Sequence, residues 1–352
     1  MKQKFGMSQR GDLKEAVSGL GNPQLLILMS NGEQFEKHVQ ELEELYPGIP
    51  SIGCIGMSYS GTQVVEKGVG VIAFEDGIKV ITNVLEQVST MPVRYIRRLE
   101  QDIKSIGASS QNTVCIDLCS GNDACVLTTM YSVLCKGDIP LMGGTGDAGK
   151  ISMNGKIYED GVAYALVKNQ NGKIKTYKEN IYRPMDNYRL IASNTDRGKY
   201  IIGELNGKPA KQAYLDMTGA SEKDIVNQTF KNPLGKISGQ EVCIISIKEA
   251  VGNALACYRQ VNDSDVLTLL ELQDYQRIAQ ETISKIRSDF SHISAVFSVN
   301  CLFRYLLFTQ NHNLQEYLKI MGTLGSHAGL FGYGEHYNNQ FVNQSMTCVV
   351  FE

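Results

Sequence analysis

Four short segments of the sequence carry residue types that can hold a small ligand: three of them contain glycine, and the fourth places polar residues in an apolar stretch. Each segment is expected at the end of a strand, where backbone and side chains can converge on a cleft. The segments are Gly53-Cys54, Gly143-Gly144-Thr145-Gly146-Asp147, Asn300-Cys301-Leu302-Phe303-Arg304 and Gly332-Tyr333-Gly334-Glu335. This pattern predicts a binding site for a small polar molecule, with glycines that let the backbone approach it closely.

Arg304 is the most informative of these residues, because it lies in the otherwise apolar stretch VFSVNCLFRYLLF. An arginine does not lose its charge, and a buried unpaired cation is costly. Arg304 must therefore face a carboxylate. Two interpretations stay open: an internal ion pair with Glu335, or a ligand carboxylate on Arg304 and a ligand ammonium or hydroxyl on Glu335. In the second case Tyr333, Asn343 and Asp147 would orient the ligand.

Residues 144–149 spell Gly-Thr-Gly-Asp-Ala-Gly, which fits the dinucleotide-binding pattern G-x-G-x-x-G, and Lys150 nearly completes a P-loop. Both sites need a helix directly after the glycines, because a helix N-terminus helps to hold the phosphates. Here the hairpin signature ISMNGKIYEDGVAYALV follows, and Ile151 replaces the Ser or Thr of a P-loop. The sequence therefore disfavours a phosphate site.

The cysteines do not indicate a metal site. Only Cys115 and Cys119 approach the spacing of a zinc-ligand pair, and their context, NTVCIDLCSGND, is typical of a buried strand running into a turn. The chain has nine cysteines, an odd number without a closely spaced framework, so we expect free thiols and a reducing compartment. We expect no bound metal.

No catalytic signature is recognisable. His327 and His336 flank the last glycine-rich segment, but no Ser or Cys stands in a nucleophile context such as G-x-S-x-G. An enzyme with Cys54 or Cys301 as nucleophile and a nearby histidine as base remains an alternative. Our expectation is a protein that is not an enzyme.

Length and charge narrow the class of protein further. The chain has 352 residues, which corresponds to about two domains at ~150 residues each. Its 34 Lys and Arg against 37 Asp and Glu give a formal charge of -3, which disfavours binding to nucleic acid. No apolar run reaches the ~18 residues of a membrane span, and the N-terminus lacks the apolar core of a signal peptide. We expect a cytoplasmic protein without a membrane span.

Hydrophobic periodicity and turn signals predict a first lobe in which strands alternate with helices. Helices are expected at Asp12–Leu20, Glu33–Tyr46, Val93–Ile106 and Ala124–Leu134, and strands at Leu25–Met29, Ile49–Cys54, Val64–Phe74, Ile78–Gln87, Val114–Leu118, Pro140–Gly144, Lys150–Met153 and Ile157–Val167. Asp76-Gly77 and Asn154-Gly155 between such runs are hairpin signals.

A charged, glycine-containing stretch over residues 168–181 predicts a boundary, with domains at 1–180 and 181–352. The second lobe has a similar order of elements, and both lobes end on a glycine-rich strand end followed by a last apolar strand. We therefore predict an internal duplication. The expected fold class is α/β in the mixed α+β sense: two related lobes with mixed β-sheets flanked by helices.

The chain resembles the FIST proteins, with both the N-terminal and the C-terminal FIST domain. In the N-terminal part, Leu25–Ser30, Ile52-Gly53-Cys54 and Gly143-Gly144-Thr145-Gly146-Asp147 are similar to the family's first strand, Gly-Cys segment and Gly-Gly-x-x-Asp segment. In the C-terminal part, similar motifs are Glu204-Leu205-Asn206-Gly207-Lys208-Pro209-Ala210 with Tyr214, Cys301 with Arg304, and Tyr333-Gly334-Glu335 with Asn343. Ile55-Gly56-Met57-Ser58-Tyr59 departs from the family's Ser-Thr-x-Gly-Glu.

The resemblance implies a sensory module of signal transduction that binds a small ligand such as an amino acid. The ligand-binding residues it implies, together with the segments above, are Arg304, Glu335, Tyr333, Gly334, Asn343, Cys301, Gly143, Gly144, Thr145, Asp147 and Cys54. We expect the ligand between the two lobes, no cofactor, and a separate signalling protein as partner.

Two further functions stay open. The resemblance also implies a haem-binding gas sensor, for which His327 or His336 could supply the axial nitrogen. The other alternative is a protein-interaction scaffold without a ligand.

Overall fold

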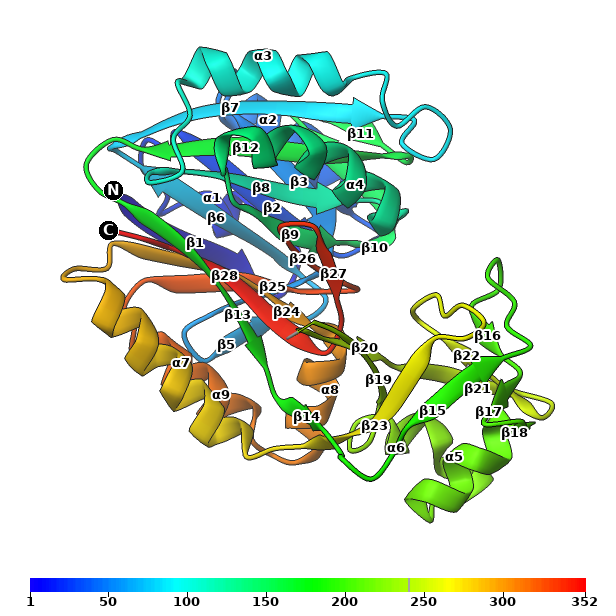
Figure 1. Ribbon diagram of the computed structural model, residues 1–352. Helices are drawn as coiled ribbons and strands as arrows, with labels where there is room; N and C mark the ends of the chain where they lie inside the picture. The colour runs from blue at the N-terminus through cyan, green and yellow to red at the C-terminus, as the bar shows by residue number, and fades with distance from the viewer. Residues whose placement is uncertain (240) are drawn as a thin grey trace. The chain divides into compact units, whose positions relative to one another are not determined.

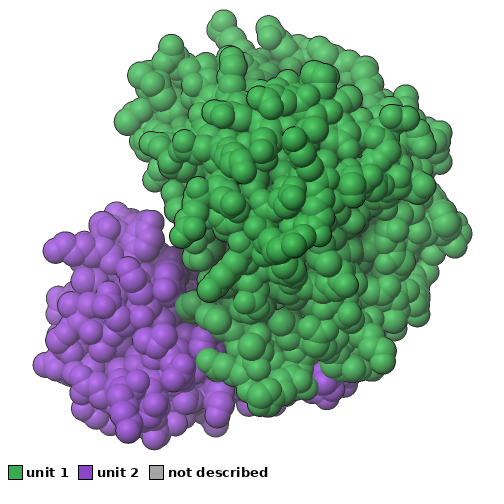
Figure 2. Space-filling model, turned by 180° about the vertical axis from the view of Figure 1, so that it is seen from behind, with its two compact units in different colours: residues 1–179, 279–341, 345–352 green, residues 180–278, 342–344 purple. Residues whose placement is uncertain are grey.

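The computed structural model describes residues 1–239 and 241–352, which form two compact units. Unit 1 contains residues 1–179, 279–341 and 345–352, and unit 2 contains residues 180–278 and 342–344 (Figure 2). The expected domains, 1–180 and 181–352, divide the chain along its sequence. The compact units are discontinuous, because most of the last 74 residues pack with the N-terminal part.

Within the described residues, unit 1 is built on three six-stranded sheets (Figure 1). The first sheet has the order β1 (Lys2–Ser8), β6 (Val69–Glu75), β2 (Leu25–Ser30), β3 (Ser51–Ile55), β10 (Asp147–Met153), β11 (Lys156–Tyr158). The second has the order β7 (Ile78–Glu86), β12 (Gly161–Asn169), β8 (Thr113–Cys119), β9 (Leu141–Thr145), β26 (Glu335–Tyr337), β27 (Gln340–Val342). The third has the order β13 (Ile174–Asn180), β28 (Ser345–Phe351), β24 (Ala295–Cys301), β25 (His327–Gly332), β4 (Met57–Ser60), β5 (Gln63–Val65).

The same module of strands and helices occurs three times in unit 1. A first strand is followed by a helix, a strand–helix–strand unit whose two strands pair in parallel, a hairpin, and a last antiparallel strand. The first helices are α1 (Leu13–Val17), α3 (Ile96–Ile106) and α7 (Tyr275–Asp289), and the second are α2 (Phe35–Leu45), α4 (Asp123–Leu134) with the short η1 (Cys135–Gly137), and the pair α8 (Leu302–Gln310) and α9 (Leu314–Gly322). The fold class is mixed α+β, as predicted, but the repeat that the sheets display is this module rather than a duplicated lobe.

The hairpin of each module pairs with a strand of another module and so extends that module's sheet. The hairpin β10–β11 of the second module pairs with β3 of the first, β26–β27 of the third pairs with β9 of the second, and β4–β5 of the first pairs with β25 of the third. All three pairings are antiparallel. The exchange is therefore cyclic, and it brings together strands that lie up to about 270 residues apart in the sequence, as Ala328 and Ser60 do.

A single central core lies between the three sheets. Alternate residues of β2, β8 and β24 enter it, for example Ile27, Ile116 and Phe297. The residues between them face outwards and pack under helices; Leu26 and Leu28 share a cluster with α1 and α2. A strand buried on both faces needs apolar residues at every position, which explains the continuous run Leu25–Met29.

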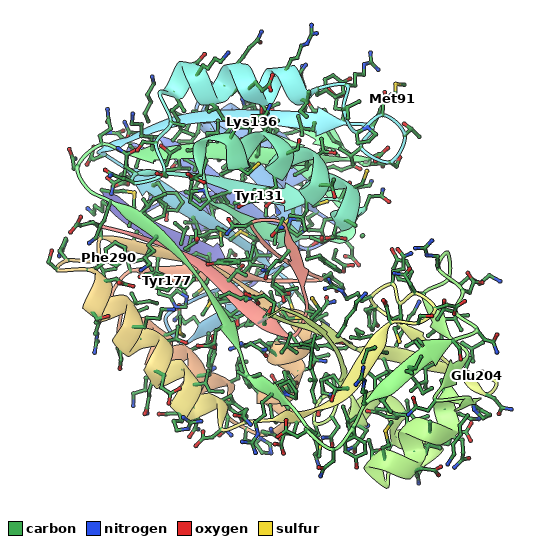
Figure 3. All side chains as sticks on the ribbon, in the orientation of Figure 1. Met91, Tyr131, Lys136, Tyr177, Glu204 and Phe290 are labelled. Atoms are coloured by element: carbon green, nitrogen blue, oxygen red, sulfur yellow. The ribbon has the colours of Figure 1, made fainter. Side chains whose placement is uncertain are left out.

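The stretch expected as a linker, residues 168–181, contains strand β13. Its buried positions are Ile174, Tyr177 and Glu179, and Lys and Thr residues lie between them. The sequence therefore lacks the regular alternation of apolar and polar residues that identifies a strand. Tyr177 donates its hydroxyl to Asp289 Oδ2 at the end of α7 (2.8 Å). Figure 3 labels Tyr177 and also Phe290, the residue that follows α7. Strand β1 was also absent from the expected elements; it pairs with β6 along its whole length.

Unit 2 is inserted into the third module, between β13 and α7. Its main sheet consists of β18 (Lys208–Pro209), β17 (Glu204–Leu205), β15 (Leu190–Ser193), β23 (Val266–Leu272), β19 (Leu234–Ser238) and β20 (Glu241–Ile245), with β14 (Tyr182–Pro184) beside β23. A second sheet contains β16 (Ile201–Ile202), β22 (Ala254–Cys257) and β21 (Ile247–Val251). The helices are α5 (Ala210–Thr218), η2 (Glu222–Asp224) and α6 (Ile225–Gln228). A separate apolar core around Tyr214 and Leu205 fills this unit.

Candidate functional site

The two glycine-rich segments singled out from the sequence meet in unit 1, because β26 pairs with β9. Glu335 lies opposite Gly144, and His336 lies opposite Gly143. The Thr145 amide donates to the Gly334 carbonyl, and the Tyr333 amide donates to the Thr145 carbonyl, both at 2.9 Å. This junction is the crossing point at which the third module passes its hairpin to the second.

The glycines at the junction are required by the chain's own packing. A Cβ atom at Gly143 would lie 2.0 Å from the Asp117 carbonyl oxygen, and one at Gly144 would lie 2.4 Å from the Gly334 carbonyl oxygen. A Cβ at Gly334 would lie 2.3 Å from the Phe341 ring. The close approach inferred from the sequence therefore takes place between strands.

Replacing Gly143 by alanine should destabilise the protein by about 1–3 kcal/mol, because the new methyl group meets backbone that cannot move aside. Chemical denaturation of Gly143→Ala measures this. Gly19→Ala is the matched control, since a Cβ at Gly19 meets nothing within 4 Å. Equal stability of the two variants would contradict the packing role of Gly143.

Arg304 lies in the first turn of α8, is only 1% exposed, and forms an ion pair with Glu179 of β13. Its Nη1 also donates to the Glu179 carbonyl at 3.4 Å, and its guanidinium lies over the rings of Phe308 and Tyr317. Of the two interpretations left open, an internal ion pair is present, but its acceptor is Glu179 rather than Glu335. Sequence reasoning missed Glu179 because it lies in the stretch expected as a linker.

Glu335 of β26 is fully buried next to this pair. The Ser345 amide and hydroxyl donate to its Oε2 at 3.3 and 3.0 Å. Burial raises the pKa of Glu335 to about 8, and the hydrogen bonds from Cys301 and Ser345 and the charge of Arg304 only partly oppose this. The carboxyl group therefore titrates in the physiological range. We refer to Glu179, Cys301, Arg304, Glu335 and Ser345 as the Arg304–Glu335 cluster.

Three ionisable side chains of the cluster each have one polar atom without a hydrogen bond among the described residues. Glu335 Oε1, Arg304 Nε and Glu179 Oε2 are buried and have no hydrogen-bond partner among the described residues. An unpaired buried polar atom costs about 1–3 kcal/mol, and such groups in native proteins call for an explanation. The cluster thus offers two acceptors and one donor to a polar molecule.

A chain of buried polar side chains continues from the cluster under α8 and α9. The Tyr317 hydroxyl lies 3.4 Å from Glu179 Oε1 and 3.3 Å from Asn300 Oδ1. Asn300 Nδ2 donates to the Tyr59 hydroxyl at 2.7 Å. The Ser298 hydroxyl lies 2.6 Å from both the Tyr59 hydroxyl and His327 Nε2. Burial lowers the pKa of His327 to about 4, so this histidine is neutral.

Successive side chains of a strand point to opposite faces of the sheet, so His336 lies on the face opposite to Glu335. Its ring lies between two aspartates. Its Nδ1 is 2.6 Å from Asp117 Oδ2, and its Nε2 is 2.9 Å from Asp123 Oδ1. Burial alone would lower the pKa of His336, but the two carboxylates outweigh it and raise the pKa to about 10. Thr145 donates its hydroxyl to Asp123. Asp117 could have been noticed as the one charge within the apolar strand VCIDLC.

These surroundings bear on the haem alternative. A haem iron binds a ring nitrogen through its lone pair, and a protonated histidine has none to offer. His336 is held as a cation with both nitrogens engaged. His327 is fully buried, with Nε2 on Ser298. Neither histidine is arranged as an axial ligand.

The remaining predicted residues are scattered. Cys54 lies in the central core, where burial raises the pKa of its thiol to about 12 and makes it a poor nucleophile. Asp147 is half-buried and accepts from the Ala148 amide at 2.7 Å. The Tyr333 side chain is 47% exposed. Asn343 belongs to unit 2, where its amide nitrogen is buried without a partner in the part of the chain that the structure describes.

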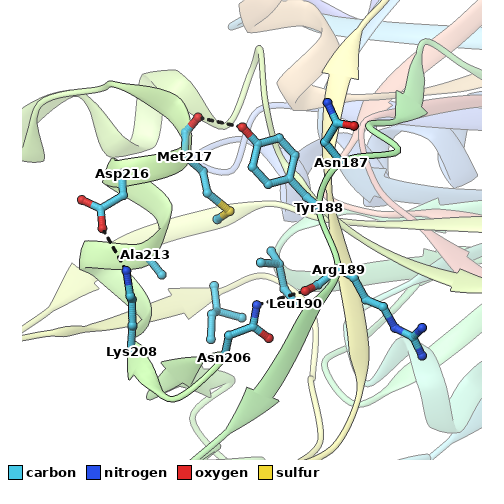
Figure 4. A pocket seen from close by; sticks show the side chains of 10 residues that line it. Asn187, Tyr188, Arg189, Leu190, Asn206, Lys208, Ala213, Asp216 and Met217 are labelled. Atoms are coloured by element: carbon cyan, nitrogen blue, oxygen red, sulfur yellow. Dashed lines mark hydrogen bonds and ion pairs between the residues drawn. The ribbon is translucent and has the colours of Figure 1, made fainter.

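The motif Glu204–Ala210 forms a hairpin turn in unit 2. Asn206 Nδ2 donates to the Arg189 carbonyl (Figure 4). Asn206 Oδ1 accepts from the Ile191 amide. The turn borders a cavity of about 240 Å³ next to Asp216 and Met217. The polar side chain of Asn206 is thus engaged in shaping the turn.

Over residues 1–239 and 241–352, His, Cys, Asp and Glu do not gather in a group that could hold a metal ion. Over the same residues, no helix has the length and apolar character needed to cross a bilayer.

Comparison with known proteins gives two family matches. The FIST N domain model matches residues 24–208, and the FIST C domain model matches residues 210–338. No curated protein matches the chain. Among solved structures, the chain is similar to a chorismatase crystal structure, with a TM-score of 0.36, 9% sequence identity, and coverage of 99% of this chain and 98% of that chain. These values are too low to carry the activity of that protein over to this chain.

Proposed function

Because this chain belongs to the FIST family, whose domains are sensory modules of signal transduction, we propose that it senses a small polar molecule bound by the Arg304–Glu335 cluster. The observation that supports this is the set of buried atoms without a partner among the described residues: Glu335 Oε1, Arg304 Nε and Glu179 Oε2. A ligand that satisfies them recovers the cost of leaving them unpaired.

The polarity of these atoms favours an amino acid as the ligand. An α-amino acid carries a carboxylate, which accepts from Arg304 Nε, and an ammonium group, which donates to Glu179 Oε2 or to Glu335 Oε1 and favours the ionised form of Glu335. Since these side chains are almost fully buried, the ligand enters through a local opening of the chain around them. Binding is thereby linked to a conformational change, as a sensor requires.

We propose further that the protein acts in the cytoplasm without a cofactor, does not turn its ligand over, and passes its signal to a separate protein. The low nucleophilicity of the buried thiols supports a binding role over an enzymatic one. Burial raises the pKa of Cys54 and Cys348, for instance, far from the depressed pKa of a reactive cysteine.

A thermal-shift screen with single proteinogenic amino acids at millimolar concentration tests this function. A ligand at a hundred times its Kd should stabilise the protein by about 2.7 kcal/mol, which raises Tm by several degrees. Glu335→Gln should abolish this shift, because it replaces a carboxyl group that can ionise beside the ligand's ammonium by an amide of the same shape that cannot. Glu44→Gln on the exposed face of α2 is the matched control and should retain the shift. A shift that survives in Glu335→Gln would contradict the proposed site.

A further inference from the structure

The chain passes between the two units next to residues of the Arg304–Glu335 cluster. Two of its crossings between the units lie between Glu179 and Asn180 and between Gln344 and Ser345. Glu179 holds Arg304, and Ser345 holds Glu335 through both its amide and its hydroxyl. The two residues that fix the buried charges are therefore the two unit 1 residues at these connections.

On the unit 2 side, the same two connections are tied to one another. Tyr182 donates its hydroxyl to Gln344 Oε1, and its amide donates to Asn180 Oδ1 at 2.9 Å. Gln344 Nε2 donates to Ser246 Oγ at 2.7 Å and to the Thr229 carbonyl at 3.3 Å. Gln344 is thus anchored in the interior of unit 2, one residue away from the hydrogen bonds to Glu335.

The backbone at Gln344 is under strain. Its φ is +50°, in the left-handed region, which costs a non-glycine residue free energy and persists only where the surroundings hold the residue there. The Gln344 carbonyl and the Ser345 amide belong to one rigid peptide plane. Any change that weakens the hold of Glu335 on Ser345, through its hydroxyl or its amide, therefore lets the peptide that Gln344 anchors reorient, and it frees Gln344 to leave the strained conformation.

We propose that the Gln344–Ser345 connection, with Tyr182 as its anchor, transmits the state of the Arg304–Glu335 cluster to unit 2, which makes unit 2 the responding part of the molecule. This coupling rests on the proposed function of the cluster as the sensor's binding site. A ligand that donates to Glu335 Oε1 shifts the carboxyl group whose Oε2 accepts from Ser345, and this loosens the connection and the hydrogen bonds of Gln344 to Ser246 and Thr229. The ligand's binding energy is the source of the change in unit 2.

Amide hydrogen exchange of the full chain, measured by NMR without any ligand, tests the coupling. Glu335→Ala removes the acceptor of Ser345, and Ser345→Ala removes only the hydroxyl and is expected to fold. In both variants the amides of Ile245 and Ile247, next to Ser246 in unit 2, should exchange about threefold to tenfold faster, as for a lost hydrogen bond. Glu44→Ala on the surface of α2 should leave them unchanged.

The anchor is tested by adding Tyr182→Phe, which removes the hydroxyl that holds Gln344. In the Tyr182→Phe background, Ser345→Ala should cause no further change in amide exchange in unit 2. Tyr188→Phe is the control background, because the Tyr188 hydroxyl contacts the Met217 carbonyl and not Gln344. In that background, Ser345→Ala should still speed the exchange. Unchanged exchange at Ile245 and Ile247 in both single variants would overturn the coupling. Because no ligand is used, this outcome is independent of a ligand screen that finds nothing.

Discussion

Replacing Arg304 by alanine is expected to lower the free energy of unfolding by about 3–5 kcal/mol, because the substitution leaves the Glu179 carboxylate buried without its cation. Both side chains are inaccessible to solvent, so water cannot take over the role of the guanidinium. The rings of Phe308 and Tyr317 also lose the cation they pack against. Denaturant titration at pH 7 measures the loss.

A double variant separates the charge from the volume. Arg304→Met combined with Glu179→Gln removes both charges while keeping long side chains, and it should recover most of the stability that Arg304→Ala loses. Arg97→Ala on the exposed side of α3 is the matched control and should change stability little. A loss below about 1 kcal/mol for Arg304→Ala, typical of a surface pair, would contradict the role of this ion pair in the fold.

Replacing His336 by glutamine is expected to cost about 3 kcal/mol or more at pH 6, because it leaves Asp117 and Asp123 facing each other without a cation. The cost should shrink as pH rises. The folded pKa of about 10 lies above the ordinary 6.5, so the folded state keeps a proton that the unfolded state has released. The stability that His336 contributes is complete below pH 6.5 and is lost as pH rises towards 10, at up to about 1.4 kcal/mol per pH unit.

Glu335 acts in the same direction over a lower range. Its folded pKa of about 8 exceeds the ordinary 4.5, so its contribution falls between those two values. Denaturation at several pH values should therefore show falling stability from pH 5 to 10, with the upper part removed in His336→Gln and the lower part in Glu335→Gln. His292→Gln, on the surface, should keep the wild-type profile. An unchanged slope above pH 8 in His336→Gln would show that this histidine is not held as a cation.

The glycine-rich segments show that a sequence pattern can locate positions of close approach correctly without revealing what approaches them. Gly143 and Gly334 were identified as positions of close approach, and the structure joins their segments. What approaches is another strand, because the hairpins are exchanged between modules. Local periodicity carries no information on a pairing between residues 143 and 336, so the partner could not be predicted from either segment alone.

Glu179 and β13 show a second limit. A strand with one buried face is recognised by alternation of polar and apolar residues, and IKTYKEN buries a carboxylate at one of its inward positions. The carboxylate is there because Arg304, 125 residues further along the chain, needs a partner. The sequence indicated that Arg304 needs an acceptor, but the choice between Glu179 and Glu335 depends on tertiary structure.

The repeat was harder to recognise than the elements within it. Most strands and helices of unit 1 lie close to their expected positions, for instance β8 and α4. The third module, however, is split by the insertion of residues 180–278, and two helices stand where the other modules have one. The two halves of the sequence, 1–180 and 181–352, therefore do not correspond to whole modules, and a comparison between them matches parts of different modules.

The most direct test of the central claim is a calorimetric titration of the full chain with the amino acid that gives the largest thermal shift. We predict one binding site per chain, no detectable binding to Glu335→Gln, and unchanged binding to Glu44→Gln. Binding of equal affinity to Glu335→Gln and to the wild type would show that the ligand does not use the Arg304–Glu335 cluster.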